Sequence, residues 1–219
     1  MSTNIRIFFE KKGRAKYISH LDIMRCFTRV IRRTDIPVWY TEGYNPRLYM
    51  MFPLPLPLGF EGERETFDIR LIDDSYPYEK ILTELNRVFP EGIKALSAEP
   101  VIDELTTIDK AIYTITLKHS DIKALKTNME EFMTLSDITV EKKSKRGIKT
   151  VNLAPDVKVQ DIKANGDYLV IRTLMAAGIN YNINPNLWLN AFMSKYGYED
   201  IVINITRNSI LRSDLSEWH

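Results

Sequence analysis

The order of hydrophobic patterns is the feature that most constrains the fold of this chain. In residues 4–10, Ile5, Ile7 and Phe9 alternate with Arg6, Phe8 and Glu10, which is typical of a strand with one strongly apolar face. Residues 20–34 carry apolar side chains every three to four positions, as an amphipathic helix does. Further strand patterns follow at 38–40, 66–72 and 93–101, and a second helical pattern lies at 76–89. The first half therefore reads strand, helix, strand, strand, helix, strand.

The second half repeats this order, with strand patterns at 111–118, 168–174 and 201–206 and helices that begin at Ser120 and Asn184. Residues 138–153 add a hairpin pattern. We predict an α+β fold of two tandem ferredoxin-like (βαββαβ) halves with antiparallel sheets, the second with an extra hairpin strand. The polar stretch 103–110 divides the chain into domains 1–104 and 105–219.

Composition narrows the classes of function. Among 219 residues the net charge is only +1, so affinity for nucleic acid must come from local patches. The single cysteine, Cys26, excludes an internal disulfide and a cysteine-based metal or iron–sulfur site. Neither a histidine metal motif nor a glycine-rich phosphate loop is present, so we expect no metal and no cofactor. With no signal peptide and no membrane-spanning apolar run, we expect a cytoplasmic protein.

A stripe of arginines follows one side of the first predicted helix. Its members are Arg25, Arg29, Arg32 and Arg33, and Lys16 precedes the helix. Guanidinium groups grip phosphates with two parallel hydrogen bonds, which favours a contact surface for RNA or a nucleotide-like ligand. The alternative is a solvated face that is partly paired with Asp22 and Asp35.

A turn at residues 42–47 offers a second binding element. Gly43 can adopt a positive φ and Pro46 fixes its own φ, so the turn would present Tyr44, Asn45 and Arg47 together. An aromatic ring, an amide and a guanidinium are suited to stacking on a base and bonding its edge. The alternative is a structural turn whose tyrosine is packed.

Prolines alternate with leucines over residues 53–58. Because alternate prolines remove every second backbone donor, this segment cannot be a central strand; we expect an edge strand or polyproline II. Its apolar side, formed by Leu54, Leu56 and Leu58, could dock a protein partner, or the segment is a rigid edge that covers the sheet.

The hairpin predicted at 138–153 has a basic tip. Its cations are Lys142, Lys143, Lys145, Arg146 and Lys149. Such a tip can follow a phosphate backbone, although lysines are also common on solvated hairpin tips.

His20 is the weak candidate for a catalytic residue. It lies in the first turn of the first predicted helix, behind the capping pair Ser19 and Asp22, where the helix dipole lowers a histidine pKa. It could act as a neutral base; a capping or buried polar role is the alternative.

Three blocks of sequence together resemble one known family. They are residues 16–22 (KYISHLD) with the arginines that follow, residues 36–46 (IPV…EGYNP) and residues 54–59 (LPLPLG). This pattern is similar to that of the radical-SAM-linked protein family, with weaker matches at 151–155 and 205–211 that extend the resemblance over essentially the whole chain. The chain departs from the family at Arg47, Leu48 and Tyr49, where the family usually has His-Pro-Lys.

The resemblance implies a bacterial protein of a family encoded beside, or fused to, radical SAM proteins, often near genes for RNA processing and ribosomal proteins. One cysteine cannot bind a [4Fe–4S] cluster, so the radical enzyme would be a separate chain. Because of the departure at 47–49, no catalytic role is carried over to the turn.

We therefore predict a non-catalytic accessory module that binds tRNA or rRNA and works with a separate radical SAM enzyme. Two alternatives stay open. One is a metal-independent endoribonuclease with His20 as its base, by analogy with tandem ferredoxin-like CRISPR endoribonucleases. The other is a pure protein-interaction module that docks through the leucines of 54–58.

Overall fold

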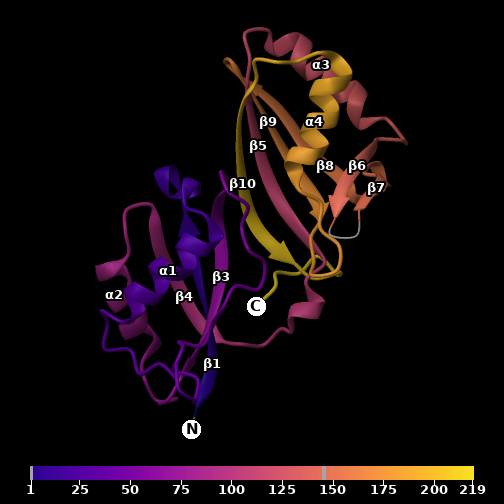
Figure 1. Ribbon diagram of the computed structural model, residues 1–219. Coiled ribbons are helices and arrows are strands. Elements are labelled where there is room, and N and C mark those ends of the chain that lie inside the picture. The colour runs from indigo at the N-terminus through magenta and orange to yellow at the C-terminus, as the bar shows by residue number, and fades with distance from the viewer. Residues whose placement is uncertain (1, 145–146) are drawn as a thin grey trace.

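The computed structural model describes residues 2–144 and 147–219, and over this part the protein is α+β, with four α-helices and a mostly antiparallel sheet (Figure 1). The helices are α1 (His20–Ile31), α2 (Tyr78–Val88), α3 (Ile122–Met133) and α4 (Pro185–Tyr196). The strands of the main sheet are β1 (Thr3–Lys11), β2 (Met50–Met51), β3 (Glu61–Leu71), β4 (Ile93–Pro100), β5 (Lys110–Lys118), β8 (Val157–Asn165), β9 (Tyr168–Ala176) and β10 (Val202–Leu211). No helix in the described residues is long and apolar enough to cross a membrane.

One sheet runs through both halves of the chain in the order β4-β1-β3-β10-β5-β9-β8, with β2 beside β3. The halves join where β10 and β3 pair in parallel, with Thr206 opposite Glu61 and Arg207 opposite Gly62. In each half a helix connects two parallel strands across the strand between them, α2 from β3 to β4 and α4 from β9 to β10. Since such crossovers are right-handed and run the same way along the sheet, α2 and α4 lie on the same face.

Each half has its own hydrophobic core beneath its helices. In the first, Phe27 of α1 packs against Phe67 of β3 with ring centroids 4.9 Å apart. In the second, α3, α4 and the strands β5, β9 and β10 enclose Phe132, Trp188 and Phe192. Leu54 and Phe60 belong to the second core although they precede residue 104. Side chains of the first half thus pack in the core of the second, in addition to the sheet that runs through both. The domain boundary predicted between residues 104 and 105 stays a prediction.

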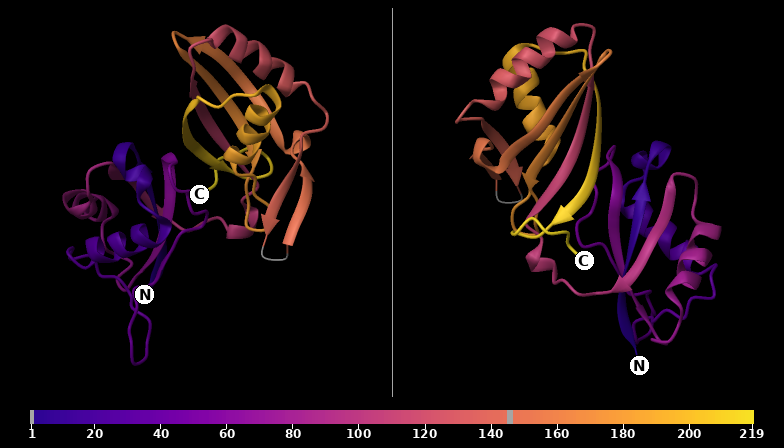
Figure 2. Two further views of the ribbon diagram at one scale, coloured as in Figure 1. Left: turned by 45° about the horizontal axis from the view of Figure 1, so that its top comes forward. Right: turned by 180° about the vertical axis from the view of Figure 1, so that it is seen from behind.

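The other face of the first half is covered by the end of the chain, behind the sheet in the view of Figure 1 and seen from behind in Figure 2. Arg6 of β1 is 1% exposed, forms two hydrogen bonds of 2.8 Å with Asp68, and lies 3.6 Å from the ring centroid of Trp218. The indole of Trp218 in turn donates to the carbonyl of Glu104. The indole ring of Trp218 thus covers the buried Arg6–Asp68 ion pair on this face.

Two expectations for the strands were wrong. The predicted hairpin does not extend the main sheet; β6 (Thr139–Ser144) and β7 (Gly147–Asn152) form a sheet of their own, and the outer strand is β8. The alternation in β8 is broken by a register shift between Val159 and Asp161, which hides the strand from a period-two pattern. The strand expected at 38–40 is reduced to isolated bridges at Val38 and Tyr40.

Candidate nucleic-acid interface

Helix α1 holds the arginine stripe in a fixed position. Its N-cap is Ser19, whose hydroxyl accepts from the backbone N–H of Asp22 at 3.2 Å and donates to the Asp22 carboxylate at 2.7 Å. The helix buries Ile23, Phe27 and Val30 against the sheet. The capped, buried side therefore fixes which residues the helix turns toward solvent.

The arginines of the stripe are exposed and mostly unpaired. Arg25 lies 3.3 Å from Asp22, but both side chains are more than half exposed, so this pair is weak. Arg29, Arg32 and Arg33 form no ion pair with any acid in the described residues. The α1 helix ends at Ile31, so Arg32 is its C-cap and Arg33 lies beyond it.

Three of these cations border a groove of about 390 Å³ between α1 and the end of α2. The groove is lined by Arg25, Arg29 and Arg33 and by one acid, Asp22, together with Cys26, Val30, Val88 and Pro90. Burial raises the pKa of the Cys26 thiol, against the effect of the neighbouring arginines, so the group in the groove is a neutral thiol. Arg25 is partly offset by Asp22, whereas Arg29 and Arg33 have no acidic partner in the described residues; two such guanidinium groups along a groove are suited to successive phosphates.

The turn at residues 41–47 is a protruding arm with a free aromatic tip. Its base is held by Arg70, whose guanidinium lies 4.9 Å from the Trp39 ring and 4.7 Å from the Tyr49 ring. At the tip Gly43 has a φ of +120°, and Tyr44 is 99% exposed. Asn45 and Arg47 are exposed beside it. A tyrosine without packing partners at the end of a braced arm is available for stacking, which disfavours the alternative of a packed turn.

The β6–β7 hairpin is a second arm. Lys142 on β6 donates to the carbonyl of Asn182 at 2.6 Å and lies 5.3 Å from the Tyr181 ring, so this lysine anchors the hairpin. Lys149 on β7 is exposed. The predicted cations Lys145 and Arg146 lie outside the described residues, as does the side chain of Lys143.

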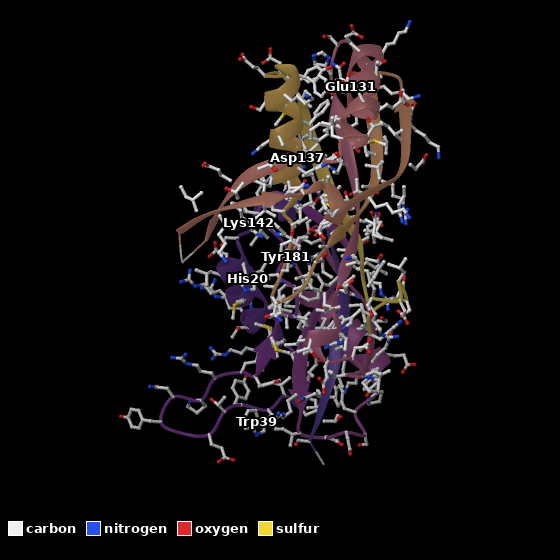
Figure 3. All side chains as sticks on the ribbon, turned by 90° about the vertical axis from the view of Figure 1, so that its right-hand side faces the viewer. His20, Trp39, Glu131, Asp137, Lys142 and Tyr181 are labelled. Atoms are coloured by element: carbon white, nitrogen blue, oxygen red, sulfur yellow. The ribbon has the colours of Figure 1, made fainter. Side chains whose placement is uncertain are left out.

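Both arms project to the same side of the molecule. Figure 3 shows the loop that follows Trp39 and the hairpin that carries Lys142 extending in one direction, with His20 of α1 between them, and the left view of Figure 2 agrees. Helix α1 lies between the two arms, and we use the name basic face for its exposed arginines Arg29, Arg32 and Arg33 together with the 41–47 arm and the β6–β7 hairpin. Segments separated by about 100 residues of sequence are thus brought to one surface.

Buried charges join the two halves beneath the basic face. Arg207 of β10 donates from Nε to Glu65 of β3 at 2.9 Å, and a second bond links its Nη2 to the same carboxylate. The Nη2 group also donates to the carbonyl of Leu54.

Burial lowers the pKa of Lys11, against the attraction of Glu65; its ammonium donates to the carbonyls of Lys16 and Ile18. These bonds fix the backbone of residues 16–18, which includes the predicted phosphate contact Lys16.

Lys16 and His20 are not arranged as free binding groups. Lys16 donates to Asn204 at 2.7 Å and lies 4.0 Å from Glu61, which ties the first half to β10. The ring of His20 meets Phe52 edge-on at 5.4 Å. Burial, with the nearby charge of Lys11, lowers the pKa of His20, so its imidazole is neutral at pH 7. A neutral imidazole packed on phenylalanine fits the buried polar role.

The leucines of the Pro-Leu segment do not share an exposed face. Leu54 is only 7% exposed and packs in the second core, and Leu56 is partly buried against the same core. Leu58 is the member of the three that is exposed, at 61%. The segment turns Leu54 and part of Leu56 inward because the two halves meet there, so the predicted docking surface of three leucines is wrong for Leu54.

One feature of this region was missed by sequence reasoning. A pocket of about 620 Å³ lies between the β6–β7 hairpin and the start of α4, with Pro57, Tyr113 and Arg207 among its lining residues. Its walls come from five separate segments, so no local sequence motif could have predicted it.

The described residues contain no cluster of acids, histidines and cysteines that could hold a metal ion.

Comparison with known proteins places the chain in a family. No curated protein matches it. The solved structure of an unknown protein from Galdieria sulphuraria covers 94% of this chain and 99% of its own, at 9% identity and a TM-score of 0.26, a similarity too weak to bear on fold or function. A family described as uncharacterized protein conserved in bacteria, DUF2344, matches residues 4–185. Since that match spans most of the 219 residues, the chain belongs to the DUF2344 family.

Proposed function

We propose that this protein binds single-stranded RNA across its basic face. The observation that carries the proposal is the set of unpaired, exposed arginines on and after α1, flanked by two arms that project to the same side (Figure 3). Guanidinium groups neutralise successive phosphates, and the free ring of Tyr44 supplies a stacking platform for a base. Cations and an exposed aromatic ring together are the combination that recognition of unpaired RNA requires.

The charge distribution supports a local site. A chain of net charge +1 does not attract polyanions over its whole surface, so affinity must come from this face. Some surface cations elsewhere are neutralised: Lys12 pairs with Glu10, Lys118 with Asp167 and Lys163 with Asp161. The arginines of α1 differ in that several of them are gathered on one helix and its C-terminal end.

The proposal also covers the architecture of the two halves, the kind of RNA and the partner enzyme. The strand orders β4-β1-β3-β2 and β10-β5-β9-β8 are those expected of two ferredoxin-like units, with β6–β7 inserted in the second. We take the halves to be such a tandem, and the RNA to be tRNA or rRNA. On the sequence resemblance alone, a separate radical SAM enzyme would act on the RNA that this protein holds.

The test is RNA binding as a function of salt. Fluorescence anisotropy with a labelled single-stranded RNA, from 50 to 300 mM salt, should give a steep loss of affinity. The double variant Arg29→Ala/Arg33→Ala removes two phosphate contacts, so the slope of log K against log salt should become shallower by about 1.4, at about 0.7 per contact. The matched control is Arg172→Ala, an exposed arginine of β9 outside the basic face.

Two outcomes would refute the proposal. One is no RNA binding at low salt; the other is an equal slope for the double variant and for the control. The same samples run on a denaturing gel report cleavage: RNA shortened by the wild type and intact with His20→Ala would establish the endoribonuclease in place of a binding module.

A further inference from the structure

The 620 Å³ pocket beside α4 has the size and the chemistry of a binding site, and nothing described so far occupies it. Such a volume lies within the range of small-molecule sites. One wall is the β6–β7 hairpin with Glu141 and Lys142, the opposite wall is the start of α4, and Pro57 of the Pro-Leu segment closes a third side. The pocket therefore opens next to one arm of the basic face.

The charged groups around this pocket include both signs. Arg207 is fully buried and held by Glu65, and the lining contains one further cation and one acid, Lys142, which donates to the carbonyl of Asn182, and Glu141. The amide N–H of Asn186 at the start of α4 is bonded to the side chain of its own cap, Asn184. With Glu65 offsetting Arg207 and Glu141 offsetting Lys142, the pocket carries no net positive charge and favours a neutral ligand over an anion.

The free hydrogen-bonding groups of the pocket are side-chain amides. Within the described part of the chain, the amides of Asn182, Asn186 and Asn190 have no intramolecular partner, although Asn182 and Asn186 are half-buried. Each amide both donates and accepts, which matches a ligand that presents donors and acceptors side by side. Apolar surfaces of Pro57, Ile183 and Leu187 stand around them.

We propose that this pocket takes a single neutral heteroaromatic base, extruded from the RNA that the basic face binds. Asparagine pairs with the edge of a base through two hydrogen bonds, and the apolar walls cover the faces of the ring. This inference rests on the proposed function for the source of the base. The pocket chemistry itself suits a free nucleoside equally, so the experiment separates the two sources.

The experiment uses the full chain and one pocket variant. Asn190→Leu removes an amide and narrows the pocket at an exposed position, so folding is preserved; Asn165→Leu, an exposed asparagine at the end of β8, is the matched control. The first measurement is saturation-transfer NMR with each of the four ribonucleosides. The second is anisotropy with four RNA 12-mers that differ at one central base in an otherwise uniform strand.

We expect saturation transfer to at least one nucleoside, lost in Asn190→Leu and kept in Asn165→Leu. We expect one 12-mer to bind more tightly than the others, and Asn190→Leu to weaken that 12-mer by about tenfold with an unchanged salt slope, since one base contact and no phosphate contact is lost. Nucleoside transfer without any RNA binding would retain the pocket for a free nucleoside and remove the proposed function.

RNA binding that is equal for all four 12-mers, together with no nucleoside transfer, would overturn the pocket and leave the basic face standing. Transfer that persists in Asn190→Leu would also overturn it, because the nucleoside would then lie elsewhere.

Discussion

Replacing Arg207 by methionine should destabilise the protein more than any change on its surface. Arg207 and Glu65 have side chains only 1% and 3% exposed, and they lie where β10 meets β3. The variant removes the guanidinium and leaves the Glu65 carboxylate buried. The perturbation therefore tests whether the two halves are joined by a charge pair that needs both partners.

The magnitude follows from what remains around Glu65. Breaking a buried pair by removing one partner costs about 3–5 kcal/mol, and the lower end applies here because the ammonium of Lys11 still attracts the carboxylate. The lost bond to the carbonyl of Leu54 adds about 1 kcal/mol. Against a total stability of about 5–15 kcal/mol, the expected loss of about 4 kcal/mol is large.

The assay is urea unfolding followed by circular dichroism. Arg207→Met should shift the midpoint far to lower urea, whereas the double variant Arg207→Met/Glu65→Leu should recover all but about 1–2 kcal/mol because no charge is left unpaired. Arg172→Met, on an exposed position of β9, is the control and should change stability by less than about 0.5 kcal/mol. A loss below about 1 kcal/mol for Arg207→Met, or a double variant as unstable as the single one, would refute the reasoning.

Three further predictions concern single positions. Gly62→Ala would place a Cβ 2.3 Å from Cγ of Glu65, which Arg207 holds in place, so we expect a loss of about 1–3 kcal/mol in urea unfolding; an unchanged midpoint would contradict this. Because burial lowers the pKa of His20, its NMR titration should have a midpoint below 6.5. Protonation then favours the unfolded chain, so the free energy of unfolding should fall as the pH drops below about 6.5 and should level off once the folded state is also protonated. The variant His20→Gln should remove this pH dependence. Tyr44→Ala should leave the thermal midpoint unchanged, because the ring is 99% exposed, while weakening RNA binding at every salt concentration; a lowered midpoint would mean that the ring packs.

Local patterns were sufficient for the elements that carry the basic face. The cap of α1 is formed by neighbours in sequence, Ser19 and Asp22, and the exposure of its arginines follows from the helical period. The same holds for the turn at Gly43, where a positive φ was expected and is found.

The features that could not be predicted from the sequence depend on contacts between residues that are far apart in the chain. Glu65 lies in a stretch of polar residues that would suit an exposed strand, and it is buried only because Arg207, 142 positions later, reaches it. Leu54 looked available for a partner because a periodic segment does not show what packs on it. In the same way, the asparagines of the pocket gain meaning only when the hairpin and Pro57 are placed opposite them.

The seal of Trp218 over Arg6 bears on how the molecule is made. Synthesis produces β1, β3 and β4 first, yet Arg6 and Phe8 lack their contacts with Trp218 and His219 until residues 216–219 have left the ribosome. Leu54 and Phe60 likewise wait for the second core to form around them. The packing of the first half is therefore completed only after the second half has been made. A nascent chain halted near residue 104 would expose this apolar surface to chaperones and proteases.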